Sequence, residues 1–259
     1  MCVMPVFFQK SVMIESMRFW QRTKTILVFL IEWSTFLLLE AVLGRLFRPY
    51  ALVAGLLALI FFLLAGIFFS GLARRFQGRY SLLALVPIGV GLAGLDQICK
   101  LLVNAHLAEG GRIPVLPPWI ALGHERNYAN SWLLNSLGVE NVNKAWLILF
   151  SLVILGLIGF FYDYYIAQQR GGFWPAAAFV FLSGGVLSAL VDQTIWGFAL
   201  DFVGLTHLVT ADLKDIDLTL GIGCLLAEAV SNPRIRWRLD PHQDLRDLRA
   251  YLESRKRPS

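Results

Sequence analysis

Long apolar runs dominate this sequence and restrict what it can fold into. A helix needs about 20 apolar residues to cross the hydrocarbon core of a bilayer. Hydrophobic residues make up 57% of the 259-residue chain and charged residues only 16%, which is less charge than a soluble domain of this length carries. We therefore predict an all-α membrane protein with six transmembrane helices, at residues 25–43, 50–72, 82–103, 144–166, 173–190 and 212–230.

Basic residues are distributed unevenly between the two sets of loops that six spans create. Cytoplasmic loops of membrane proteins carry an excess of Lys and Arg, which predicts that both termini are cytoplasmic. The net charge of +5 then reflects topology and gives no reason to expect nucleic-acid binding. Arg45 and Arg48, between the first two spans, are exceptions. The clusters on the predicted cytoplasmic side lie in the leader, at residues 74–79, at Arg170 and at residues 234–238.

The segments outside the spans suggest how the chain is organised. Residues 1–24 form a charged, partly amphipathic leader that we expect on the cytoplasmic membrane surface. The stretch 112–120, within the loop 104–143, is rich in Pro and β-formers and predicts extended backbone. The chain ends in a charged cytoplasmic tail, residues 232–259, with a short helix from about Pro241.

Six polar side chains are predicted to collect at the extracytoplasmic boundary of the bilayer. Ionisable groups in a membrane segment are costly unless they are paired or line a wet cavity. Two neighbouring carboxylates cannot both ionise cheaply, so one keeps its proton while the other can act as a base, as in aspartic proteases. Carboxylates that merely reach the interface would give the same pattern. The six are Asp96, Lys100, Asn127, Asp192, Asp201 and Asp217.

Five segments around these residues occur in an order known from one family. They are residues 95–100 (LDQICK), 124–132 (HERNYANSW), 184–193 (GGVLSALVDQ), 199–202 (ALDF) and 216–223 (IDLTLGIG). In this order they resemble the DQxxK, (R/Y)NxGxAF, GGAxGNxxDR, VVDF and ADSxIxxG motifs of the lipoprotein signal peptidases (signal peptidase II).

The resemblance implies a fold and an activity. Residues 81–231 would form a signal-peptidase-II-like core of four helices with a small extended extracytoplasmic segment, preceded by two extra helices in residues 25–80. The family cleaves signal peptides from diacylglyceryl-modified prolipoproteins in the bacterial inner membrane, without metal or other cofactor. The catalytic pair would be Asp201 and Asp217. The residues that bind substrate or support the site would be Asp96, Lys100, Asn127 and Asp192.

The second catalytic aspartate has an alternative. Pairing Ala211 and Asp212 with the family's Ala-Asp dipeptide keeps that dipeptide, but it loses the small residues at Gly221 and Gly223 from their register. We therefore prefer Asp217.

Several residues that orient the family's site are replaced here, among them by Ala129, Ala189 and Gln193. A site that has lost supporting groups can lose activity even when its catalytic residues remain. The leading hypothesis is an aspartyl endopeptidase that acts on lipid-modified prolipoproteins among membrane lipids. The alternatives are an inactive relative that holds a lipid or a partner helix, the latter through residues 25–72, and a transporter that uses the buried aspartates.

Two other classes of site are disfavoured. Residues 89–94 spell G-x-G-x-x-G, but they lie inside a predicted membrane helix and lack the strand–turn–helix context of a dinucleotide site. The histidines and cysteines show no metal-ligand spacing.

Overall fold

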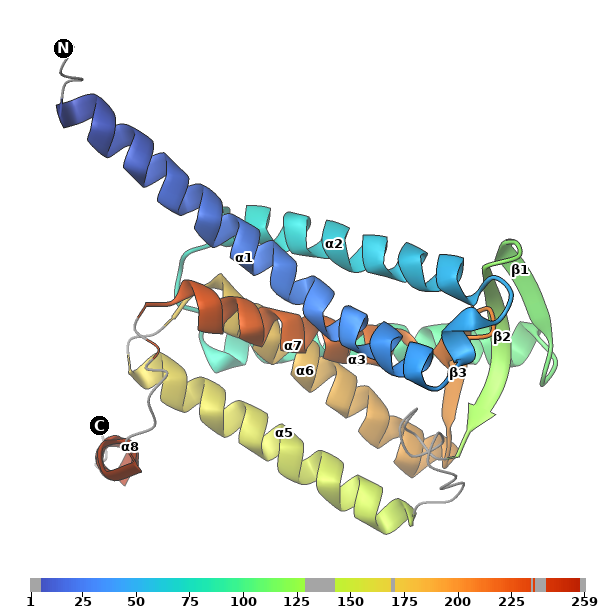
Figure 1. Ribbon diagram of the computed structural model, residues 1–259. Helices are drawn as coiled ribbons and strands as arrows, with labels where there is room; N and C mark the ends of the chain where they lie inside the picture. Colours follow the sequence, from blue (N-terminus) through green and yellow to red (C-terminus); the bar gives the residue numbers. More distant parts are fainter. Residues whose placement is uncertain (1–5, 129–142, 169–170, 234, 236–240, 257–259) are drawn as a thin grey trace, which may run out of the picture.

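Long helices lie side by side, and four short strands gather at one end of them (Figure 1). The computed structural model describes residues 6–128, 143–168, 171–233, 235 and 241–256. The chain therefore has the predicted membrane-helix architecture with a small extended part. The helices are α1 (Val6–Val42), α2 (Ala51–Arg75), α3 (Leu82–His106), α5 (Lys144–Ala167), α6 (Phe173–Val191), α7 (Leu213–Ser231) and α8 (Pro241–Lys256).

Five helical segments within the described residues are long and apolar enough to cross a bilayer: Arg22–Val42 of α1, then α2, α3, α5 and Phe173–Trp196. This makes the chain a multi-pass membrane protein. The sixth predicted span corresponds to α7, which is outside this set because it carries four charged side chains. These are Lys214, Asp215, Asp217 and Glu228. The structure thus supports five of the six predicted spans by length and composition.

Helix α1 contains both the described residues of the predicted leader and the predicted first span. It runs from Val6 to Val42 without a break, and its N-terminal part extends beyond the other helices (Figure 1). The predicted leader and first span are therefore one continuous helix. At the other end of the chain, a helix begins at Pro241, where the sequence predicts one.

The helices α1 and α2, which precede the signal-peptidase-like segment, are built into the core. Phe29 of α1 is 1% exposed and belongs to a buried cluster with residues of α2, α6 and α7. A Cβ atom on Gly223 of α7 would lie 2.6 Å from the Phe29 ring, so only glycine permits this close approach. The Trp33 indole N–H donates a hydrogen bond to the Gly55 carbonyl at 2.9 Å and joins α1 to α2.

A second buried cluster joins the helices of the remaining bundle. It contains Leu85 of α3, Tyr162 of α5 and Phe179 of α6. The Tyr162 hydroxyl donates to the backbone carbonyl of Tyr80 at 2.8 Å, just before α3 begins. The backbones of α3 and α6 also approach closely, since a Cβ atom on Gly89 would lie 2.6 Å from Ser183 Oγ. This glycine of the G-x-G-x-x-G stretch therefore serves helix packing.

The strands form one antiparallel sheet in the order β1-β2-β3-β4. Its first half, β1 (Arg112–Leu116) and the start of β2 (Ile120–Asn127), coincides with the predicted extended segment. Its second half, β3 (Ala199–Leu205) and β4 (Val209–Ala211), is not predicted from the sequence. The sheet joins the α3–α5 connection to the α6–α7 connection, and Asp201 of β3 pairs with Glu125 of β2.

Candidate active site

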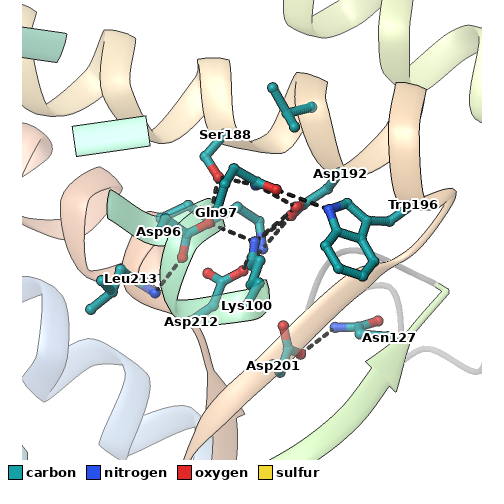
Figure 2. A network of polar contacts seen from close by, with 12 residues as sticks. Asp96, Gln97, Lys100, Asn127, Ser188, Asp192, Trp196, Asp201, Asp212 and Leu213 are labelled. Atoms are coloured by element: carbon teal, nitrogen blue, oxygen red, sulfur yellow. Dashed lines mark hydrogen bonds and ion pairs between the residues drawn. The ribbon is translucent and has the colours of Figure 1, made fainter. Parts of the chain in front are cut away.

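A fully buried lysine holds three carboxylates together at the sheet end of the bundle (Figure 2). Asp96 and Lys100 are one turn apart on α3, and Lys100 Nζ lies 2.6 Å from Asp96 Oδ2. The same nitrogen lies 2.7 Å from Asp192 Oδ2, at the end of α6, and 2.7 Å from Asp212 Oδ2, just before α7. All four side chains are 0% exposed. Buried charges persist only when they are paired and hydrogen-bonded, so this cluster fixes how α3, α6 and α7 meet.

Neutral side chains complete the hydrogen bonding of the cluster. The Gln97 amide donates to Ser188 Oγ and to Asp192 Oδ1, both at 2.9 Å, and its carbonyl oxygen accepts from the Trp196 indole at 2.9 Å. The Ser188 hydroxyl in turn donates to Asp96. Because each acidic residue has a defined partner, the network holds its members in one arrangement (Figure 2).

Helix α7 begins at the cluster through the side chain of Asp212. Its carboxylate accepts a hydrogen bond from the Asp215 backbone N–H at 3.1 Å, and the Asp215 side chain accepts one from the Asp212 N–H, which makes a capping box. Lys214 forms a second ion pair with Asp212, and its Nζ lies 3.4 Å from Asp192 Oδ2. The N-cap carboxylate therefore faces two lysine ammonium groups, which favour its ionised form.

Asp201 lies beside Asp212 in a different environment. The Asn127 amide donates to Asp201 Oδ2 at 2.9 Å, while the buried Oδ1 has no hydrogen-bond partner among the described residues. Carboxylate oxygens of Asp201, Asp212 and Asp215 lie within 4.8 Å of one another. Burial raises the pKa of Asp201 to about 8, because the opposing effect of the Lys214 ammonium is smaller and Asp212 adds to the rise. Asp201 therefore keeps its proton at neutral pH, beside a carboxylate held in its ionised form.

A cavity of about 890 Å³ opens onto Asp201. At the site its wall includes Asn127, Asp201 and Lys214, and further along it is formed by the sheet and by aromatic side chains of α1 and α2. Its volume is within the range of small-molecule and cofactor sites. A ligand in this cavity would therefore contact Asp201.

The comparison with known proteins places these features in a family. Residues 88–231 match the family model for Signal peptidase (SPase) II, which is more than half of the chain. This chain belongs to the signal peptidase II family. It is similar to the lipoprotein signal peptidase of Staphylococcus carnosus (strain TM300), with 26% identity over 152 residues that cover 57% of this chain and 90% of that protein. It is also similar to the lipoprotein signal peptidase of Leifsonia xyli subsp. xyli (strain CTCB07), with 31% identity over 156 residues that cover 58% and 67%.

The fold of this signal peptidase II family member also resembles a solved bacterial membrane enzyme. The TM-score is 0.51 at 16% sequence identity, and the match covers 63% of this chain and 99% of the other. Since the family match begins at residue 88, helices α1 and α2 lie before the segment shared with the family.

The predicted site residues of this signal peptidase II family member fall into two connected groups. Asp96, Lys100 and Asp192 meet in the buried cluster, and Asn127 binds Asp201. The sequence motifs pair Asp201 with Asp217, and that pairing stays a prediction. Asp217 is buried in α7 but is not in the carboxylate group around Asp201.

The carboxylates that lie within 4.8 Å of Asp201 are those of Asp212, the alternative second acid, and Asp215. A signal for Asp212 exists in the sequence, because Asp212 and Asp215 have the spacing of a helix-capping pair and so indicate where α7 begins. Lys214 was not predicted as a site residue at all. Its position follows from Asp212, since a lysine in the first turn of α7 reaches back to the carboxylate that caps the helix.

The replaced family residues lie close to the cluster or outside the described residues. Gln193 follows Asp192 and is 6% exposed, with no hydrogen-bond partner for its buried Oε1 within the described part of the chain. Ala189 follows Ser188, the serine that binds Asp96. Ala129 and the rest of its segment, up to residue 132, lie outside the described residues.

Two groups of acidic residues have the spacing of metal ligands, and they overlap at Asp212. Asp96, Asp192 and Asp212 form one group, but the Lys100 ammonium lies between them and supplies the positive charge that a metal ion would bring. Asp201, Asp212 and Asp215 form the other, and there Lys214 contacts Asp212. Both groups thus have a lysine as counter-ion, and the expectation of a metal-free site stays a prediction.

Proposed function

We propose that this chain is a membrane aspartyl endopeptidase that removes signal peptides from diacylglyceryl-modified prolipoproteins, with Asp201 and Asp212 as its catalytic pair. One observation carries the proposal: two buried carboxylates lie within 4.8 Å of each other in opposite electrostatic environments. The substrate class follows from the family, whose named relatives are lipoprotein signal peptidases.

The two environments suit the two roles that the reaction needs. Asp212, next to the ammonium groups of Lys100 and Lys214, starts ionised and accepts a proton from a water molecule. The water oxygen bonds to the carbonyl carbon of the scissile peptide, while the protonated Asp201 donates its proton to the carbonyl oxygen. When the tetrahedral intermediate collapses, the C–N bond breaks and the proton on Asp212 passes to the leaving amine. Asp201 recovers its proton from the intermediate's hydroxyl.

Positioning falls to residues around the pair. Asn127 donates to Asp201 Oδ2 and leaves Oδ1 as the oxygen that carries the catalytic proton. The capping box fixes Asp212 at the start of α7. Lys100 sets the distance between α3, which carries Asp96, and the start of α7.

A second candidate function rests on Lys214. A second ammonium group against Asp212 lowers the basicity of this carboxylate, and a weaker base accepts the proton of water less readily. In that case the chain would be a non-catalytic relative that keeps the cavity to hold a lipid or a partner helix.

The decisive experiment compares three aspartates in one assay. We expect Asp201→Asn and Asp212→Asn each to lower cleavage of a purified diacylglyceryl-prolipoprotein by about 10²- to 10⁴-fold, and Asp217→Asn to lower it far less. Asp163→Asn, at an ion pair with Arg255 of α8, is the matched control. Size-exclusion chromatography and thermal unfolding check that each variant is folded.

Each possible outcome has a clear meaning. Full loss in Asp217→Asn together with retained activity in Asp212→Asn would make Asp217 the partner of Asp201. Wild-type protein that binds the prolipoprotein but does not cleave it would instead support the non-catalytic relative.

A further inference from the structure

The cavity at the candidate active site has a second, basic region that the proposed cleavage does not use. Two of its lining residues are Arg45 and Arg48, which lie in the short turn η1 (Arg45–Phe47) and immediately after it, between α1 and α2. Both precede the segment that matches the signal peptidase II family, which begins at residue 88. The extra helical hairpin therefore contributes positive charge to a cavity that the family core shares.

The position of these arginines goes against the charge distribution of the rest of the chain. They lie at the end of the bundle that carries the sheet, whereas Arg74 and Arg75 lie at the opposite end of α2 (Figure 1). Positive residues are normally concentrated on one side of the membrane. Arginines at the other end of the same helix therefore need a local reason.

The structure orients Arg45 toward the cavity through a buried acid. Glu40 near the end of α1 is 0% exposed, and its Oε1 lies 3.6 Å from Arg45 Nη1. This distance is longer than a hydrogen bond, and both Glu40 oxygens lack a hydrogen-bond partner among the described residues. Glu40 thus attracts the Arg45 guanidinium through its charge and not through a hydrogen bond.

Arg48 has the more open side chain. It is exposed and forms no ion pair within the described part of the chain, whereas the cavity's other arginines have acidic partners. Arg112 pairs with Glu125 and Arg126 with Glu109. Arg48 is therefore the arginine of this cavity whose charge is left for a ligand.

The wall beside the two arginines is apolar. Trp33 and Phe36 of α1 and Leu57 and Phe61 of α2 line the same cavity. A free phosphate ion would gain nothing from this wall. A lipid would gain from both parts, because its phosphate would face the arginines while its glyceryl group and the start of an acyl chain would lie along the aromatic side chains.

We propose that the α1–α2 hairpin forms a binding site for an anionic phospholipid, with Arg45 and Arg48 on the phosphate and the aromatic wall of the cavity on the apolar part. The site does not depend on peptide cleavage, because the proposed reaction uses none of these residues. The hairpin would then keep an anionic lipid next to the site where a lipid-modified substrate is handled.

The test measures bound lipid directly and needs no cleavage. Purified full-length protein in non-ionic detergent is mixed with equal amounts of dioleoylphosphatidylglycerol and dioleoylphosphatidylcholine, and bound lipid is counted by native mass spectrometry. We expect wild-type protein to prefer phosphatidylglycerol. Each basic residue near an anionic lipid strengthens binding by about fivefold. Arg48→Gln should therefore reduce the preference for phosphatidylglycerol over phosphatidylcholine by about fivefold. Arg45→Gln/Arg48→Gln should bind the two lipids almost equally.

Control variants separate this site from a general charge effect. Arg74→Gln/Arg75→Gln removes the same charge from exposed residues at the far end of α2 and should leave the preference unchanged, as should Arg48→Lys. If Arg45→Gln unfolds the protein because Glu40 is left without a counter-ion, Glu40→Gln/Arg45→Gln removes the buried pair as a unit, and Arg48→Gln tests the exposed residue alone.

Three results would overturn the proposal. They are equal binding of the two lipids by wild-type protein, an unchanged preference in Arg48→Gln, and an equal loss in Arg74→Gln/Arg75→Gln. Displacement of the lipid by millimolar inorganic phosphate would also refute it, because the apolar wall would then contribute nothing.

Discussion

Replacing Lys100 with methionine should destabilise the protein more than any other single lysine substitution we consider. The side chain is 0% exposed, and its Nζ lies within 2.7 Å of carboxylate oxygens from three different segments. Methionine keeps much of the length and volume of lysine but removes the charge. The variant therefore leaves Asp96, Asp192 and Asp212 buried against the single ammonium of Lys214.

The loss of stability in Lys100→Met follows from the buried ion pairs that the substitution removes. Removing one partner of a buried ion pair costs about 3–5 kcal/mol, because a charge is left without compensation. For a chain of this size, each kcal/mol shifts the unfolding midpoint by about 2–4 °C. We therefore expect Lys100→Met to lower the apparent midpoint by roughly 6–20 °C. The exposed Lys24 provides the control Lys24→Met, which should change it little.

Thermal unfolding of the detergent-solubilised protein, followed by tryptophan fluorescence, measures this shift. A second variant tests the cause: Lys100→Met/Asp192→Asn removes one of the uncompensated carboxylates and should recover part of the loss, which is the non-additivity expected of contacting charges. A midpoint for Lys100→Met within about 2 °C of the Lys24→Met control, or a double variant less stable than Lys100→Met, would refute the reasoning.

Three further predictions concern the dyad, the hairpin and the network. Asn127→Leu removes a hydrogen bond that favours the ionised form of Asp201, so the pKa of Asp201 should rise above about 8. The basic limb of the pH profile of cleavage, where Asp201 loses its proton, should then move to higher pH. A move to lower pH would contradict the assignment. Phe29→Ala should lower the free energy of unfolding by about 3–5 kcal/mol. Gly223→Ala should lower it by about 1–3 kcal/mol, because the new methyl group would overlap the Phe29 ring. Thermal unfolding should show that the double variant is more stable than the sum of the two losses predicts. Ser188→Ala should cost roughly 1.5–3 kcal/mol because a hydrogen bond to a buried carboxylate is lost, and an unchanged midpoint would show that the serine is not needed.

The sequence predicts much of this architecture because the signals are local. Apolar runs long enough to span a bilayer locate α2, α3, α5 and α6. The i, i+4 spacing of Asp96 and Lys100 places both on one face of α3, and the topology brings Asp192 to the same end. These groups meet because a bilayer gives buried charges few other partners.

The second acid of the proposed pair could not be fixed in the same way. Asp212, Asp215 and Asp217 lie within six residues, and which of them faces Asp201 depends on where the helix begins. The capping box places that start after Asp212, so Asp212 lies at the helix end beside the sheet. The register of β3 against β2 aligns Asp201 with Glu125. This is a long-range pairing that no local sequence pattern predicts.

Hydropathy locates the membrane-length part of α1 but not the start of the helix. Polar residues before Thr25 predict a charged leader, and helix hydrogen bonding is internal to the segment, so the helix does not have to begin where the apolar run begins. The helix therefore starts at Val6 and continues into the membrane-length part.

The close contact between Phe29 and Gly223 has a mechanical consequence. With so little space between the ring and the α7 backbone, the two helices cannot slide past each other without disrupting the buried cluster, so α1 and α7 shift as a unit. The N-terminus of α7 is where Asp212 is held. Any molecule that binds the α1–α2 hairpin and tilts it will therefore also move Asp212, one member of the proposed catalytic pair. The geometry of the peptidase core then depends in part on helices outside the family segment.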